Sequence, residues 1–178
     1  RKANFLKNTE FVPEMVYWTE GGELRKNLHS SINIVKLNAS NLWQLLFQFI
    51  NYFNKSNPKV IHTPTFMVAN IALIARIFSS HKPKIIIGAR SDFDSVCKAS
   101  NNYFDELKLR MLSQFLYPKS DRIVAVSKGV KNSLLASLDI EDSKIEVIYN
   151  GILSEKHRDN SEKPNHPWFV SKEICLIS

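Results

Sequence analysis

Carboxylates are missing from a long internal part of this sequence. No Asp or Glu occurs between residues 24 and 91, whereas nine Lys and Arg side chains do. The 178-residue chain has a formal net charge of +7, so this basic segment accounts for the excess positive charge. Such an uneven distribution favours an anionic partner, for example a phosphate group, a membrane surface or a nucleic acid. The alternative is a solvated basic face that keeps the protein soluble.

Cysteines and long apolar runs are also scarce. The two cysteines, Cys97 and Cys175, lie far apart without metal-site spacing, so a reducing compartment is the simpler assumption. No run reaches the roughly 18 apolar residues of a membrane-spanning helix. The nearest, residues 66–78, is interrupted by Asn70 and Arg76. We therefore expect no metal site and a cytoplasmic protein, either free or peripheral on the inner face of a membrane.

What the sequence does contain is a regular alternation of short β-branched runs with helical periodicity. Strands are expected at residues 15–18, 31–37, 59–62, 84–88, 123–126 and 145–148. Helices are expected at residues 41–55, 66–79, 101–117 and 128–137, and an ordered loop at 89–100. Because parallel strands need a crossover of about a dozen residues, this order predicts an α/β fold with a mainly parallel, Rossmann-like sheet flanked by helices.

Two of the expected helices carry broad apolar stripes. In the helix at 101–117, the side expected to be buried holds Leu107, Met111, Leu112, Phe115 and Leu116. In the helix at 41–55, apolar residues cover more than half the circumference, which usually means burial against a sheet. The alternative is that Trp43, Phe47 and Phe53 partly face a bilayer or a lipid substrate.

The carboxyl ends of the parallel strands are where we expect the functional residues. These ends face the same side of the sheet, and ligands of such folds bind outside them. The residues placed there are His62, Thr63, Arg90, Ser127, Lys128, Asn150 and Gly151.

Arg90 is the strongest of these candidates, because it follows a fully apolar strand and its guanidinium could hold a phosphate bidentately. A salt bridge to Asp92 or Asp94 is the competing interpretation. Ser127 is expected to cap the following helix, and the same helix start, with Lys128, is a possible anion site. His62 is either an ordinary histidine at a strand end or a base.

Several sequence runs together resemble the N-terminal Rossmann-like domain of GT-B glycosyltransferases of family 4. The most specific are SDRIVAVSKGVKNSLL and KIEVIYNGI, and similarity extends over residues 14–178 through PKVIHT, KIIIGARSDF and HPWF. The resemblance implies an acceptor-binding domain at residues 1–153 without its first strand, a linker at 154–169, and the first strand of a truncated donor-binding domain at 170–178. It therefore implies a fragment cut at both ends, and Arg1 in place of a starting Met agrees.

By resemblance, the full-length protein is a retaining, hexosyltransferase-type enzyme that moves a sugar from a nucleoside diphosphate sugar to a glycan or lipid-linked acceptor. It needs no cofactor besides this co-substrate. Arg90 would approach the donor sugar and phosphate, although many members have histidine there, and Ser127 would lie beside the cleft. Asn150 and Gly151 would lead to the hinge. Because the donor-gripping residues lie downstream of Ser178 in the family, the fragment alone is expected to be inactive.

Two other functions remain open at this point. The basic segment could hold RNA or DNA, but this would need aromatic side chains interleaved with exposed basic ones, so nucleic acid is the less favoured partner. Alternatively, the chain could belong to another GT-B-like enzyme such as a sugar-nucleotide epimerase, which shares the architecture. Product analysis separates an epimerase from a transferase.

Overall fold

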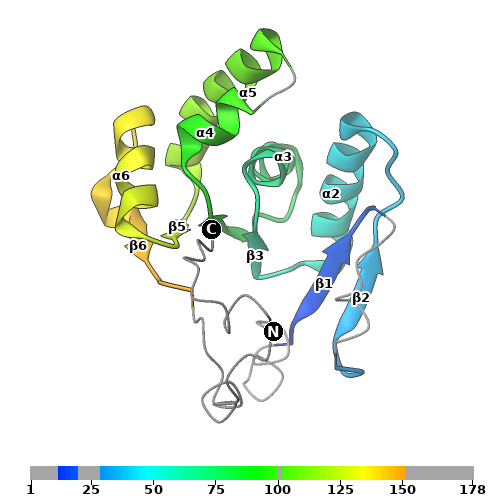
Figure 1. The fold of residues 1–178 in the computed structure, drawn as a ribbon. Coiled ribbons are helices and arrows are strands. Elements are labelled where there is room, and N and C mark those ends of the chain that lie inside the picture. Colours follow the sequence, from blue (N-terminus) through cyan, green and yellow to red (C-terminus); the bar gives the residue numbers. More distant parts are fainter. Residues whose placement is uncertain (1–11, 20–28, 100–101, 151–178) are drawn as a thin grey trace, which may run out of the picture. The chain divides into compact units, whose positions relative to one another are not determined.

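A computed structural model describes residues 12–19, 29–99 and 102–150 of the chain (Figure 1). The strands are β1 (Glu14–Tyr17), β2 (Asn33–Lys36), β3 (Val60–Thr63), β4 (Lys84–Ala89), β5 (Arg122–Ala125) and β6 (Ile145–Val147). The helices are α2 (Leu42–Ser56), α3 (Phe66–Phe78), α4 (Phe93–Lys98), α5 (Tyr103–Leu116) and α6 (Lys128–Ser137), with 3-10 turns η2 (Tyr117–Lys119) and η3 (Asp142–Lys144). Gly151, the expected linker and the expected strand at 170–178 lie outside the described residues.

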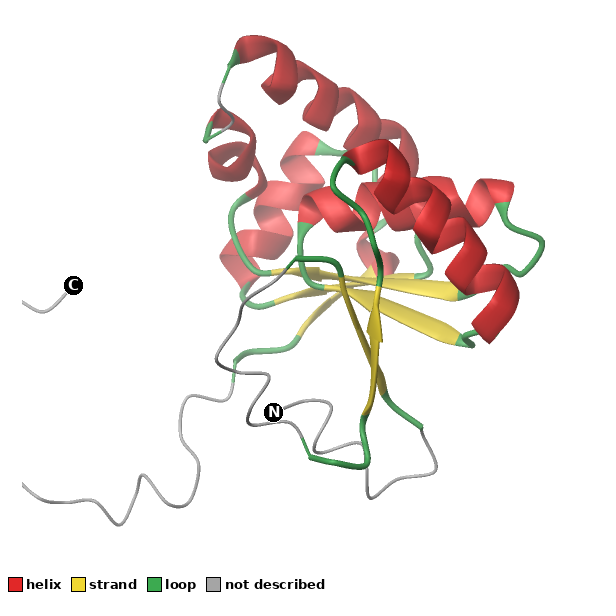
Figure 2. Cartoon of the chain, turned by 90° about the vertical axis from the view of Figure 1, so that its right-hand side faces the viewer, coloured by secondary structure: helices red, strands yellow, loops and turns green. Residues whose placement is uncertain are grey.

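The main sheet confirms the predicted α/β fold. Strands β3, β4, β5 and β6 lie side by side in chain order, and each neighbouring pair is parallel. Right-handed crossovers in this order place each connecting helix on the same face of the sheet. Figure 2 shows the described helices together on one side of the strands.

The core lies between this sheet and its helices. Alternate strand residues face the helices and are buried, among them Ile85, Ile87 and Ile123, whereas Ile86 between them is half-buried on the other face. Helix α3 is buried along most of its length, because it packs between α2 and α5 as well as on β3 and β4. This placement explains why α3 is the most uniformly apolar helix of the sequence.

Strands β1 and β2 form a separate parallel pair. The Glu14 carboxylate ties this pair to α2, because it accepts hydrogen bonds from Asn33 Nδ2 at 2.6 Å and from the Tyr52 hydroxyl at 2.7 Å. Burial and the bond to Glu14 raise the pKa of Tyr52 well above its usual value, so the phenol stays protonated and donates.

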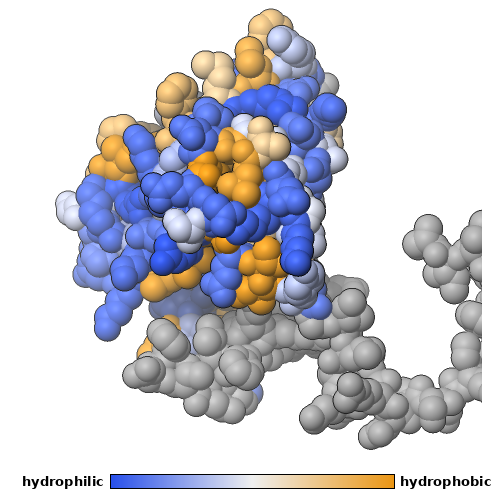
Figure 3. Space-filling model, turned by 90° about the vertical axis from the view of Figure 1, so that its left-hand side faces the viewer, coloured by the Kyte–Doolittle hydropathy of each residue, from blue (hydrophilic) through white to orange (hydrophobic). Residues whose placement is uncertain are grey.

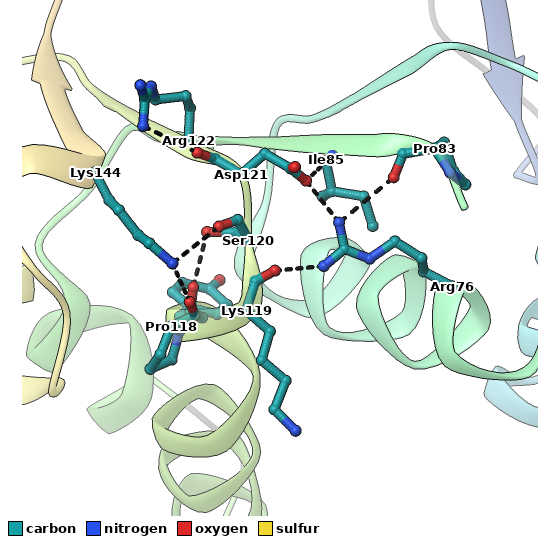
Figure 4. A network of polar contacts seen from close by, with 10 residues as sticks. Arg76, Pro83, Ile85, Pro118, Lys119, Ser120, Asp121, Arg122 and Lys144 are labelled. Atoms are coloured by element: carbon teal, nitrogen blue, oxygen red, sulfur yellow. Dashed lines mark hydrogen bonds and ion pairs between the residues drawn. The ribbon is translucent and has the colours of Figure 1, made fainter.

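A polar network fastens the amino-terminal ends of β4 and β5 (Figure 4). Arg76 Nη1 lies 2.6 Å from Asp121 Oδ2, and the same oxygen accepts the backbone N–H of Ile85 at 2.8 Å. Arg76 also donates to the carbonyl of Lys119, and Lys144 donates to that of Pro118. Arg76, near the end of α3, is therefore paired with polar groups at the amino-terminal edge of the sheet.

Three expectations about the helices are corrected. Residues 93–98 of the expected loop form α4, which is capped by the Asp92 side chain. Leu107, Met111, Leu112 and Phe115 of α5 are exposed, although Leu116 is buried as expected. In α2, Phe53 is fully buried, whereas Trp43 and Phe47 are exposed.

Candidate functional site

The candidate site lies at the carboxyl edge of the main sheet, defined here by the residues that follow β4 and β5. The hydrogen bonds between β4 and β5 continue as far as this edge, where the Val126 N–H donates to the Ala89 carbonyl at 3.1 Å. Ala89 and Ala125 are register partners. Arg90 and Ser127 therefore leave neighbouring strands at nearly the same level, so the structure brings these two candidates to one edge.

The Arg90 side chain is exposed and makes no hydrogen bond or ion pair within the described part of the chain. The competing carboxylates are engaged elsewhere. Asp94 Oδ1 lies 2.5 Å from Arg110 Nη1, and Asp92 Oδ1 accepts the Ser95 N–H at 2.7 Å. The salt bridge between Arg90 and Asp92 or Asp94 is therefore absent, which leaves the guanidinium available to an anionic ligand.

The segment after Arg90 is held in place by hydrogen bonds that the sequence analysis missed. The Phe93 N–H donates to Ser133 Oγ on α6 at 3.1 Å, which joins the start of α4 to the neighbouring helix. Hydrogen bonds from Ser133 and Ser95 lower the pKa of Asp92. Asp92 is a residue type favoured at a helix start and Asp94 is an acidic residue in the first turn, and these two are the signal that could have located α4.

Ser127 caps α6. Its Oγ accepts the Val130 N–H at 3.2 Å, and its backbone is extended, as is usual for an N-cap residue. Lys128, the first helical residue, is exposed. Among carboxyl-edge candidates, Ser127 thus has an observed structural role, whereas binding of an anion by this helix start stays a prediction.

His62 and Thr63 lie in β3 and do not follow it, which corrects their expected position. Their register partners are Ile86 and Ile87 of β4. At about 3.3 Å per residue, the His62 backbone is therefore roughly 13 Å from the Arg90 backbone along the strand direction, whereas the His62 ring reaches toward Gly88. The Thr63 side chain is buried, and its Oγ1 has no hydrogen-bond partner within the described residues.

The remaining features add little to this edge. Asn150 is exposed, and in the described ranges no cluster of His, Cys, Asp and Glu could hold a metal ion. A hollow lined by Pro118, Asp139, Glu141 and Lys144 lies at the amino ends of β5 and β6. This is the edge of the sheet opposite the carboxyl edge that carries Arg90.

Comparison with solved structures places this fold among the GT-B glycosyltransferases. A glycosyltransferase from Rickettsia africae aligns with a TM-score of 0.61 and 21% identity, over 87% of this chain and 41% of that one. The apo form of the lipopolysaccharide outer core galactosyltransferase WaaB aligns with a TM-score of 0.52 and 15% identity, over 69% of this chain and 32% of that one. At these identities the likeness concerns the fold.

Sequence comparison defines the family. Residues 13–156 match the model of Glycosyltransferase Family 4, so the chain belongs to this family, as the resemblance predicted. A curated relative from Campylobacter jejuni is 38% identical over 82 residues. It is the N-acetylgalactosamine-N,N'-diacetylbacillosaminyl-diphospho-undecaprenol 4-alpha-N-acetylgalactosaminyltransferase. The match covers 46% of this chain and 22% of that protein, and the chain likewise spans less than half of the two solved relatives.

Proposed function

We propose that this chain is the acceptor-side N-terminal part of a retaining glycosyltransferase of the hexosyltransferase type. The full-length enzyme would transfer a sugar from a nucleoside diphosphate sugar to a glycan or lipid-linked acceptor. The family match over residues 13–156 supports transfer of a sugar. The observation that carries the site assignment is the exposed Arg90 guanidinium, which has no partner among the described residues and lies at the carboxyl edge of the sheet.

Arg90 has the chemistry that such a reaction needs from this half of the enzyme. Negative charge develops on the diphosphate as its bond to the sugar breaks, and a fixed guanidinium stabilises that charge. If the departing phosphate takes the proton of the acceptor hydroxyl on the same face of the sugar, the configuration is retained without a general base. This route needs no side chain of the carboxyl edge to act as a general base.

The acceptor proposal draws on the curated relative, whose name specifies a diphospho-undecaprenol substrate. We extend to this chain only the chemical class, a lipid-linked saccharide. A cytoplasmic location with peripheral attachment to a membrane would suit such an acceptor. None of the described helices is long and apolar enough to cross a bilayer.

Titration calorimetry of the full-length protein against a panel of nucleoside diphosphate sugars tests the proposal. We expect one donor to bind, and we expect its sugar to appear on a lipid-linked or glycan acceptor with retained anomeric configuration. Residues 1–178 alone should bind no donor and show no turnover. If the full-length protein bound none of the donors, the proposal would be abandoned, and an inverted product would refute retention.

A further inference from the structure

Ser133 lies in the middle of α6 and makes two hydrogen bonds to the segment between β4 and α4. Its Oγ accepts the Phe93 N–H at 3.1 Å, and its hydroxyl also hydrogen-bonds to the Asp92 carboxylate. One hydroxyl can accept from an N–H and donate to a carboxylate at the same time. Because Ser133 and Phe93 are 40 residues apart in the chain, these bonds join two separate elements.

The setting of Ser133 differs from that of the other polar residues around it. Figure 3 faces the side of the molecule on which Figure 1 places α6, and hydrophilic side chains cover most of that side. Lys128 and Asn132 of α6 are exposed, whereas Ser133 is half-buried. Helix α6 packs against α4. The Ser133 hydroxyl is therefore turned toward the residues that follow Arg90 and does not belong to the solvated surface.

The segment that carries Arg90 is fixed at both ends. At one end, the Ala89 carbonyl accepts the Val126 N–H of the chain that follows β5. At the other end, the Phe93 ring is 1% exposed and packs edge-on against Phe66, with ring centroids 5.4 Å apart. Only three residues lie between these two fixed points. The Arg90 backbone is thereby held in place, while its guanidinium is exposed.

We infer that Ser133 is a positioning residue for Arg90. Through Asp92 and the Phe93 N–H it holds the start of α4 against α6, and it thereby sets where Arg90 lies relative to the start of α6 at Ser127. A group that stabilises developing charge is effective only when it is held in place before the reaction, and a misplacement of about 1 Å can cost roughly 100-fold in rate. The inference rests on the proposed function, because it requires Arg90 to act on that charge.

A purely structural role is the competing explanation for Ser133. Loss of the hydroxyl would then lower stability without any dependence on Arg90. A positioning role makes a different prediction, because a residue that acts through Arg90 has nothing left to position once the guanidinium is gone. The effects of the two replacements on kcat/KM should therefore be strongly coupled.

Steady-state kinetics of the full-length protein test the inference, with the donor that calorimetry identifies and its acceptor. S133A should lower kcat roughly tenfold and change the KM for the donor less than about twofold, because the positioned charge acts in the transition state. S133T keeps the hydroxyl and should recover most of kcat. The matched control is S137A, one turn further along α6, where the serine hydroxyl makes no hydrogen bond within the described part of the chain. It should keep wild-type kinetics.

The double variant R90A/S133A decides whether Ser133 acts through Arg90. Adding S133A to R90A should lower kcat/KM by less than about a further twofold. A loss of about tenfold in both backgrounds would make Ser133 a structural residue and overturn the inference. Wild-type kinetics in S133A, with R90A impaired, would also overturn it and leave the proposed function standing. Wild-type kinetics in R90A would contradict the proposed site, and the inference would fall with it.

Hydrogen exchange of the full-length protein tests the contact without any assay of transfer. In S133A, the amides of residues 91–98 should exchange at least about tenfold faster than in the wild type, because the start of α4 has lost its attachment to α6. The amides of β4 should exchange as in the wild type, which shows that the variant is folded. S133T and S137A should match the wild type throughout. Unchanged exchange at residues 91–98 in S133A would overturn the inference whatever the kinetics. If the full-length protein bound no donor, the proposed function would fail first.

Discussion

The His62 imidazole lies against Gly88 of the neighbouring strand. A Cβ atom at position 88 would come within 3.0 Å of His62 Nε2 and 3.2 Å of His62 Cε1. Gly88 follows Ile87, the register partner of Thr63, so glycine at this position leaves room for the ring over the face of β4. The His62 ring is therefore positioned by contact with Gly88, two residues before Arg90 in the chain.

Replacing Gly88 by Ala tests this contact. We expect Gly88→Ala to lower the free energy of unfolding by about 1 kcal/mol, because the ring must move to admit the methyl group. In a His62→Ala background, the same replacement should cost nothing. Urea unfolding of the two single variants and the double variant gives the coupling energy. Equal costs in both backgrounds would show that the ring does not restrict position 88.

The Arg76–Asp121 pair predicts a larger effect on stability. Asp121→Ala should cost about 2–3 kcal/mol, because one carboxylate oxygen serves both the Arg76 guanidinium and the Ile85 N–H. Asp142→Ala is the matched control, since its carboxylate pairs with Lys131 on the surface and is 71% exposed. It should cost less than about 1 kcal/mol. Similar losses in the two variants, measured by urea unfolding, would contradict the structural role given to Asp121.

Periodicity predicted the strands and most helices because each has a clear local signal. For α6, the cap at Ser127 and the spacing of Val130 and Leu134 gave both bounds correctly. Helix α4 was missed because its six residues span less than two turns, which is too short for a periodic signal. Its start depends on Asp92 and on contact with Ser133, a residue far along the chain.

Periodicity also cannot say which environment an apolar stripe faces. The stripe of α5 exists, as predicted, but the opposite side of the helix faces the core, with Leu109, Ser113 and Leu116. For the carboxyl edge, the order of strands placed Arg90 and Ser127 correctly. His62 was misplaced because the end of β3 lies one residue further along than the sequence indicated.

The lowered pKa of Asp92 predicts a pH-dependent contribution to stability. Hydrogen bonds from Ser133 and Ser95 favour the charged carboxylate in the folded state. A folded-state pKa below the unfolded value, near 3.9, means that the stabilisation is present above that value and is lost as pH falls through the folded-state pKa. Asp92→Ala should therefore be less stable than the wild type at pH 6. The difference should shrink as the pH is lowered toward 3 in urea titrations. A constant difference across this range would exclude the charge as its cause.

Ser127 allows capping to be separated from ligand binding. Ser127→Ala should lower the free energy of unfolding by about 1 kcal/mol, since the Val130 N–H loses its acceptor. Ser127→Asn should restore stability, because its side-chain oxygen can accept the same bond. Transfer activity of the full-length protein then decides the second role. Restored activity in Ser127→Asn makes Ser127 purely a cap, whereas restored stability without activity shows that the hydroxyl is needed at the site.

Arg90 is the residue on which the proposed site depends most. Arg90→Ala in the full-length protein should lower kcat/KM at least about 100-fold, the loss typical when a group that stabilises developing charge is removed. Arg90→Lys should recover part of it, because a lysine supplies charge without bidentate geometry. Arg122→Ala is the matched control, an exposed arginine at the opposite end of the neighbouring strand, and should keep wild-type kinetics. Neither replacement should change the Tm of thermal unfolding much, since both side chains are exposed. Equal kinetics in Arg90→Ala and Arg122→Ala would remove Arg90 from the site, and the carboxyl edge would then need another anion-binding group.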